Sequence, residues 1–450
     1  MARLFARAAV TLILSFLLLT PAAARTIIRD SEIETYLARL SRPIFEAAGL
    51  DPALVHLYMV RDPRLNAFVA GGQNIFLHTG LLMRTETPEQ LAGVIAHETG
   101  HIAGGHLARI GRAAEQATVE ALLGAVLGAA AAAAGSPEAG TALILGGQTL
   151  AQRSFLKFTR TQESAADHAA VSYLEAGGMS PRGLLDFLRI LERSGFGLTI
   201  EGAEYLRTHP LTRERIRALE AVVARSPTRD ARLPAEMYRA HARMVAKLEG
   251  FLEKPERVLD KRKGRRFEDR YARAVALFRI GRTDDAVKLV RDLLAAEPQN
   301  PYLWELLGQI QFESGRVEEA EGPYRRAVEL APNAALLRFG LARVLAEMGD
   351  PARLEEARRL LRAVLREDQR NAGASRLLGV VEGRLGHRGE SFLRLAEWAV
   401  LTKRKREADL YIERARAALP PGDPRRLRLE DLAREAARLE DRRGRRRKRR

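Results

Sequence analysis

The chain has 450 residues, no cysteine and a net charge of +17 at pH 7. The absence of cysteine excludes disulfides, a cysteine nucleophile and a lipid-modified N-terminal cysteine. Eight of the positive charges lie in residues 442–450 and two more at Arg3 and Arg7, which leaves +7 for the rest, so the charge does not indicate nucleic acid as a partner.

The first residues have the pattern of a secretory signal peptide. Arg3 and Arg7 precede an apolar run over residues 8–19, and Pro21 and three alanines provide a small-residue cleavage site. We predict a signal peptide at 1–24 and a mature chain that begins at Arg25. The alternative is an uncleaved anchor, but twelve apolar residues are short for a membrane span. The expected location is the bacterial periplasm, with the protein either soluble or peripheral on a membrane.

Two segments have the β-rich, alternating composition of strands, residues 54–60 and residues 66–77, with Gly71 and Gly72 at a turn. Residues 66–70 or 73–78 are candidates for an open edge on which an extended peptide substrate pairs. The other interpretation is a purely structural sheet. We expect His78, at the end of this hairpin, to lie at the surface.

A metal-binding pattern follows at residues 97–101, which read His-Glu-Thr-Gly-His. Thr87 and Pro88 predict the start of a helix, on which His97 and His101 project from one face. Two imidazoles one turn apart suit zinc, and Glu98 beside them is the candidate base that takes a proton from water.

The third ligand is sought further along the chain. One family of zinc proteases has a histidine six residues after the second ligand, where this chain has Leu107; His106 comes one place early and is turned by about 100° around the helix. We therefore expect His106 to be a helix-surface residue or to support a ligand. Glu163 and Asp167 share one face of a later helix, so one carboxylate could bind the metal while the other orients a ligating imidazole.

A mostly alanine segment separates these two helices. Residues 121–135 carry no charge, and a second apolar stretch runs to Gly147 after Ser136, Pro137 and Glu138. Neither arm is long enough to cross a bilayer comfortably. We predict a helical hairpin that packs on the domain or lies near the active-site mouth, and membrane-surface contact stays open.

Three motifs in order, residues 97–101, the pair Glu163 and Asp167, and the segment 207–211 followed by Arg215, resemble the gluzincin zinc metalloproteases that include the prenyl-protein endoprotease and the bacterial heat-shock membrane protease. The resemblance covers about residues 30–225. It implies one zinc ion per chain bound by His97, His101 and Glu163.

The same resemblance gives roles to the remaining site residues. Glu98 is the catalytic base, Asp167 orients a ligand, and His209 and Arg215 lie over the metal. His209 either donates to the oxyanion or occupies the fourth zinc position at rest. Arg215 either neutralises the oxyanion or pairs with an acidic neighbour.

Beyond the charged stretch at residues 260–266 a period of 34 residues begins, with pairs such as Gly281 and Gly315 or Pro298 and Pro332. Residues 301–334 match the tetratricopeptide (TPR) pattern, a third unit spans about 335–371 with an insertion near Pro351, and a fourth, weaker unit starts near 372. Stacked helix pairs form a concave surface typical of partner binding. A role as a mere support for the protease is the other interpretation.

The predicted fold is therefore mainly α: an α+β zincin-like domain with a small sheet, followed by an α-solenoid of TPRs. The predicted boundaries are signal peptide 1–24, protease 25–232, helical and charged linker 233–266, repeats 267–436 and basic disordered tail 437–450.

This domain order resembles the periplasmic β-barrel assembly-enhancing proteases. The resemblance implies an endopeptidase that degrades misassembled outer-membrane proteins, with repeats that bind these clients or the β-barrel assembly machine. The alternative function is a chaperone-like adaptor with latent proteolysis. The basic tail is a candidate for contact with an anionic membrane surface. We expect no nucleic acid as a partner.

Overall fold

The computed structural model describes residues 27–133, 136–193, 205 and 208–439, which fall into two compact units. One unit comprises residues 33–245 with the segment before residue 30, and the other comprises residues 30–32 with those from 246 onward. The predicted signal peptide and all but three residues of the predicted tail lie outside the described residues. The predicted fold class is confirmed, because the described chain is mainly helical, with a small mixed sheet and a series of helix pairs.

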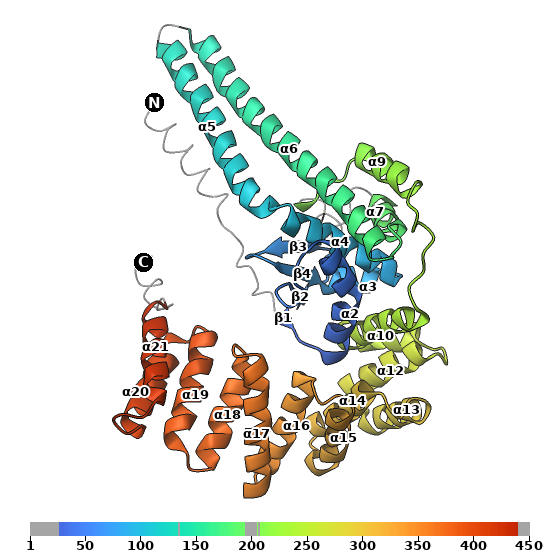
Figure 1. Cartoon of the computed structure of the whole chain (residues 1–450), viewed down its shortest axis with the longest axis vertical. Coiled ribbons are helices and arrows are strands. Elements are labelled where there is room, and N and C mark those ends of the chain that lie inside the picture. Colours follow the sequence, from blue (N-terminus) through green and yellow to red (C-terminus); the bar gives the residue numbers. More distant parts are fainter. Residues whose placement is uncertain (1–26, 134–135, 194–204, 206–207, 440–450) are drawn as a thin grey trace. The chain divides into compact units, whose positions relative to one another are not determined.

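A four-stranded sheet belongs to the first unit (Figure 1). Its strands follow the order β1 (Ile27–Ile28), β2 (His56–Val60), β4 (Asn74–His78) and β3 (Ala67–Ala70). β4 is parallel to β2 and antiparallel to β3, to which it connects through Gly71 and Gly72 at φ values of 62° and 96°. Only glycine adopts such values at little cost.

This order decides between the two candidate edges. Within the described residues β3 is an edge strand, so residues 66–70 include the open edge. The alternative at residues 73–78 is wrong, because β2 and β3 pair with the two sides of β4. The predicted surface position of His78 is also wrong. Its side chain is fully buried, 3.9 Å from Asp62 Oδ1 and 3.3 Å from the Arg64 carbonyl oxygen.

Helix α4 (Pro88–Ala103) is the central element of this unit. Its start follows the predicted cap, since the Thr87 hydroxyl accepts a hydrogen bond from the Gln90 N–H. The helix packs against β3, α6 (Pro137–Ala176) and α7 (Arg182–Arg193). A Cβ on Gly100 would lie 3.0 Å from the Ala166 carbonyl oxygen, so this glycine lets α6 approach α4 closely.

Helices α5 (His106–Ala133) and α6 form a long antiparallel hairpin that extends away from the sheet (Figure 1). The predicted hairpin is thus present, but two expectations are wrong. It does not pack on the domain along its length, and its second arm is not separate from the helix of Glu163, because α6 continues through both. None of the helices in the described part of the chain combines the length and the apolarity needed to span a membrane.

The remaining helices of the first unit are α2 (Ser31–Ala47), α3 (Thr79–Arg84) and α9 (Arg213–Val223), together with most of α10 (Ala235–Leu252). Tyr36 on α2 donates a hydrogen bond of 2.8 Å to Nδ1 of the buried His241 on α10. Nε2 of His241 donates to the Thr85 carbonyl oxygen at 2.8 Å. These contacts hold α10 to the rest of the unit.

The second unit continues with α11 (Pro255–Lys261) and five helix pairs. The pairs are α12 (Phe267–Arg279) with α13 (Thr283–Ala296), α14 (Pro301–Glu313) with α15 (Val317–Leu330), α16 (Ala335–Met348) with α17 (Pro351–Glu367), α18 (Ala372–Arg384) with α19 (Arg388–Leu401), and α20 (Lys405–Ala418) with α21 (Arg425–Ala437). Each pair contains a glycine at positive φ between its helices: Gly281, Gly315, Gly349, Gly386 and Gly422. The 34-residue period is therefore the spacing of a helix pair with its glycine turn.

Candidate metal centre

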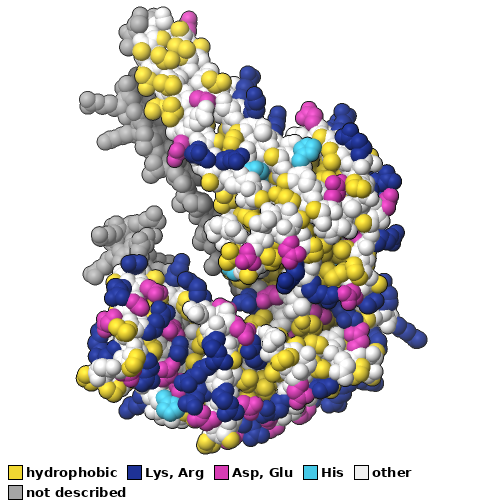
Figure 2. Space-filling model, viewed as in Figure 1, with side chains coloured by type: hydrophobic (Ala, Val, Ile, Leu, Met, Phe, Trp, Pro, Cys, Tyr) yellow, Lys and Arg dark blue, Asp and Glu magenta, His cyan; other side chains and the backbone are white. Residues whose placement is uncertain are grey.

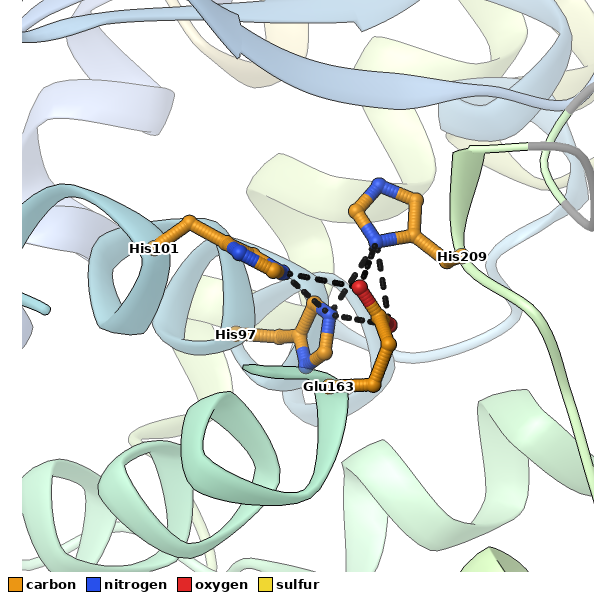
Figure 3. A group of neighbouring side chains, drawn as sticks. All are labelled: His97, His101, Glu163 and His209. Carbon is orange, nitrogen blue, oxygen red and sulfur yellow. Dashed lines mark hydrogen bonds and ion pairs between the residues drawn. The ribbon is translucent and has the colours of Figure 1, made fainter. Parts of the chain in front are cut away.

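Four side chains from three parts of the first unit converge on one point (Figure 3). His97 and His101 come from α4, Glu163 comes from α6, and His209 comes from the segment before α9. All four are buried, and one ligand atom from each lies within 4.8 Å of the other three. The structure thus brings together the three residues expected to bind zinc and His209, which was expected either at the fourth zinc position or as a donor to the oxyanion.

The separations around His97 suit a tetrahedral ion. His97 Nε2 lies 3.1 Å from His101 Nε2 and 3.3 Å from His209 Nδ1, and Glu163 oxygens lie 3.4 Å from each Nε2 of the two α4 histidines. With zinc–nitrogen and zinc–oxygen bonds of about 2.0–2.1 Å, a tetrahedral site has edges of roughly 3.3–3.4 Å. The donor set of three imidazoles and one carboxylate therefore fits zinc in both chemistry and spacing.

Asp167 and Arg215 support this cluster from behind. Asp167 Oδ1 lies 2.9 Å from His97 Nδ1, which leaves Nε2 of that ring directed at the cluster. Arg215 donates to both Asp167 oxygens at 2.5 and 3.0 Å, and its Nη1 lies 2.8 Å from Glu163 Oε2. Arg215 is therefore paired with acidic neighbours. The same Nη1 donates to the Pro210 carbonyl oxygen at 3.1 Å, which ties the His209 segment to α6.

The buried charges shift the pKa values of the cluster in opposite directions. Burial opposes ionisation, but Asp167 and Glu163 raise the pKa of His97 to about 9. Burial, together with the neighbouring His97 and His209, lowers the pKa of His101 to about 2. Although burial works against the charged carboxylate, His209 and His97 hold the pKa of Glu163 well below its usual range. The pocket thus favours a cation held between the carboxylates.

Glu98 differs from the other carboxylates of the site. Both of its carboxylate oxygens are buried, and neither accepts a hydrogen bond from the described residues, although His209 Nε2 lies 3.3 Å from Oε1. Burial raises the pKa of this carboxyl. A buried carboxylate without donors is costly unless water or a substrate group completes its hydrogen bonds, as a general base requires.

Two further residues contact the ligands of the site. Of the two alternatives for His106, a helix-surface position is wrong, because the residue is buried and its Nδ1 lies 2.9 Å from His101 Nδ1, as a residue that supports a ligand would. Gly105, at a φ of 62°, turns the chain between α4 and α5 so that this ring reaches back. Tyr205 stacks on the His209 ring at 4.7 Å between centroids and is fully buried. The five-residue spacing of His106 from His101 is a signal for the first, and no local pattern marks the second.

Comparison with known proteins places the two halves of the chain separately. Residues 29–223 match peptidase family M48, whose members are zinc metallopeptidases, and residues 288–424 match the cytochrome c-type biogenesis protein H TPR domain. The curated relatives include the β-barrel assembly-enhancing protease of Escherichia coli strain K12, which is 26% identical over 422 residues, 92% of this chain and 85% of that protein. Its counterpart in Yersinia pestis is 27% identical over 350 residues, 73% of this chain and 68% of that protein. Among solved structures, YrrB, a TPR protein with an unusual peptide-binding site, matches 38% of this chain and 91% of its own at 21% identity and a TM-score of 0.32.

Proposed function

We propose that this chain, a metallopeptidase whose residues 29–223 form a peptidase family M48 domain, is a zinc-dependent endopeptidase of the bacterial periplasm that degrades misassembled outer-membrane proteins. The observation that carries the proposal is the cluster of His97, His101, Glu163 and His209 beside the buried carboxylate of Glu98, whose oxygens accept no hydrogen bond from the described residues. Metal ligands and a candidate base lie within one buried site, as hydrolysis of a peptide bond requires.

In this proposal His97, His101 and Glu163 hold the zinc ion, with Asp167 and Arg215 fixing the orientation of His97 and Glu163. Zinc, when bound, supplies a Lewis acid that polarises the scissile carbonyl and lowers the pKa of water. Glu98 accepts the proton of the attacking water on a carboxylate oxygen and passes it to the nitrogen of the leaving amine. Its raised pKa suits this exchange, because such a carboxylate binds and releases a proton nearer to neutral pH.

The edge strand β3 provides a surface for an extended substrate. The Asn66 carbonyl oxygen accepts a hydrogen bond from the His78 N–H in β4. Successive carbonyl groups of a strand point to opposite sides, so the next one, that of Ala67, points away from β4. His209 Nε2 lies 3.2 Å from that Ala67 oxygen. A peptide that pairs with β3 next to the zinc ligands would compete with His209 for this carbonyl.

This competition favours the latch role of His209. At rest, His209 Nδ1 lies with the zinc ligands and Nε2 lies between Ala67 and Glu98. A substrate strand displaces the ring and opens the site to water. The second candidate function, a chaperone-like adaptor with latent proteolysis, is favoured by the same contacts, because an undisplaced His209 leaves only the binding function of the repeats.

The location and the clients rest on other features. The signal-peptide pattern at residues 1–24 supports export to the periplasm, and the name of the relatives supports clients of the outer membrane. The five helix pairs support binding of a protein partner, either the client itself or the β-barrel assembly machine.

The test compares the mature protein with Glu98→Gln. Both proteins are assayed for zinc content and for cleavage of casein or an unfolded outer-membrane barrel protein. We expect one zinc ion per chain in each protein and cleavage only by the parent. Zinc in both without cleavage by either would support the adaptor, whereas cleavage that survives Glu98→Gln would contradict the proposed base.

A further inference from the structure

The α5–α6 hairpin carries most of the exposed apolar surface of the described chain. Of its seventeen exposed large hydrophobic side chains, eleven lie on this hairpin, with 40–61% of each exposed: Leu107, Ile110, Val119, Leu122, Leu123, Val126, Leu127, Leu143, Leu145, Leu150 and Leu156. Figure 2 shows hydrophobic side chains gathered over the end of the hairpin. A surface of this kind, concentrated on one element, marks an interaction site.

In the hairpin, small residues lie between the two helices and large apolar side chains face outward, the reverse of a usual amphipathic helix pair. Its two helices touch through glycines: a Cβ on Gly124 would lie 2.7 Å from the Gly147 Cα, and a Cβ on Gly128 would lie 2.4 Å from the Gly140 carbonyl oxygen. Val119, Leu122 and Val126 lie on the side of α5 away from these glycines, since at 100° per residue each projects about 120–180° around the helix from both Gly124 and Gly128. Small residues between helices and large apolar residues outside are typical of helices surrounded by lipid.

Charge is distributed along the hairpin in two zones. Between residues 116 and 152 the only charged side chains are those of Glu120 and Glu138. Nearer the domain, the two helices carry five exposed basic residues and one exposed acidic residue, Glu115. The basic residues are Arg109, Arg112, Arg153, Lys157 and Arg160. None of these five forms an ion pair with the residues that the structure describes.

The apolar part of α5 is shorter than the thickness of a bilayer's hydrocarbon core. From Val119 to Ala133, α5 rises about 22 Å at 1.5 Å per residue, less than the roughly 30 Å of a bilayer's hydrocarbon core. It is therefore long enough to enter one leaflet, with the basic residues left at the level of the lipid headgroups, where lysine and arginine attract anionic phosphates.

We propose that the outer part of the hairpin, residues 119–133 and 136–150, inserts into one leaflet of a bilayer that carries anionic lipids. The unpaired basic residues at its base are complementary to lipid phosphates, and they would repel one another if two hairpins associated in parallel. This inference does not depend on the proposed peptidase activity.

The absence of cysteine allows a direct test on the full chain. Leu123→Cys is labelled with an environment-sensitive fluorophore and mixed with phosphatidylcholine vesicles that contain phosphatidylglycerol. We expect a blue shift and quenching by lipids that carry a quencher in their acyl chains. Leu54→Cys, which is equally exposed but lies before β2, is the matched control and should show neither. An unshifted label at position 123 would overturn the proposal.

A second variant tests the same surface without a label. Replacing Leu122, Leu123, Val126 and Leu127 by Gln removes apolar side chains that are already exposed, so the fold is retained, and vesicle binding should fall about tenfold or more. Leu410→Gln with Leu427→Gln, two exposed leucines of the repeats, should bind as the parent does. Equal binding by the four-residue variant would overturn the proposal. It would also be overturned if the parent did not bind vesicles but self-associated in sedimentation velocity, and the four-residue variant did not self-associate.

Discussion

His209 Nδ1 lies 3.3 Å from His97 Nε2, although 112 residues separate the two in the chain. The His209 ring is held in this position by Tyr205, which stacks on it, and by the Ala67 carbonyl oxygen. If His209 closes the zinc site at rest, its removal must affect proteolysis in a direction that identifies its role.

We therefore predict that His209→Ala raises basal cleavage of casein, by roughly threefold or more, because the closed state is lost. The double variant with Glu98→Gln should be inactive, which shows that the added cleavage comes from the same centre. A loss of activity in His209→Ala alone would instead support the oxyanion role.

Replacing Arg215 should weaken metal binding and destabilise the unit. Its guanidinium neutralises Glu163 and Asp167 in a buried position, so Arg215→Met leaves two carboxylates without their counterion. We expect zinc affinity to fall about 10–100-fold and the free energy of unfolding without zinc to fall by about 3 kcal/mol or more. Chelator competition and thermal melting measure the two effects. Arg217→Met, at an exposed position of the same helix, is the control, and an unchanged zinc affinity in Arg215→Met would contradict the positioning role.

His106 should determine which ring nitrogen of His101 carries the proton. When His101 carries its proton on Nδ1 and donates it to His106 Nδ1, the Nε2 of His101 stays free for the metal. We expect His106→Ala to weaken zinc binding about tenfold. His106→Asn, whose amide oxygen accepts the same hydrogen bond, should restore part of the affinity. His168→Ala removes an exposed histidine of α6 and should have no effect. If His106→Asn binds zinc no better than His106→Ala, the hydrogen bond is not the cause.

In the repeats, Tyr324 lies between two glycines of neighbouring helix pairs. A Cβ on Gly340 would lie 2.3 Å from a ring carbon of Tyr324, and one on Gly308 would lie 2.6 Å from another. Gly340→Ala should therefore lower the free energy of unfolding by about 1–3 kcal/mol. Gly373→Ala, which meets only ordinary contacts near the start of α18, should be neutral or stabilising by up to about 1 kcal/mol. Chemical denaturation of the full chain, followed by circular dichroism, compares the two, and a loss of similar size in both would contradict the steric explanation.

His241 predicts a pH dependence of stability. Burial lowers the pKa of this imidazole below its usual 6.5, despite opposing effects of the Thr85 carbonyl and Glu89. The folded state therefore binds its proton more weakly than the unfolded state, so the stability that the neutral ring provides is complete above about pH 6.5 and decreases as the pH falls below that value.

The comparison uses His241→Gln, whose amide can donate to Thr85 and accept from Tyr36 without titrating. The difference in melting temperature between parent and variant, followed from about pH 8 to pH 5, should change in favour of the variant as the pH falls. A constant difference would show that His241 does not titrate on unfolding.

The sequence by itself predicted which side chains lie together wherever helical periodicity determines this. His97 and His101 share a face of α4, Glu163 and Asp167 share a face of α6, and the 34-residue period corresponds to the helix pairs. These relationships are local, since a helix places residues four apart on one side whatever it packs against.

The tertiary structure decided what depends on contacts between distant segments. Packing of the segment before α9 against β3 brings His209 to His97, His101 and Glu163, and two carboxylates of α6 decide that Arg215 pairs with them. The sequence also did not show that the leucines of the hairpin point outward, because apolar periodicity is the same for a face that meets a core and for one that stays exposed. The glycine contact between α5 and α6 distinguishes the two cases.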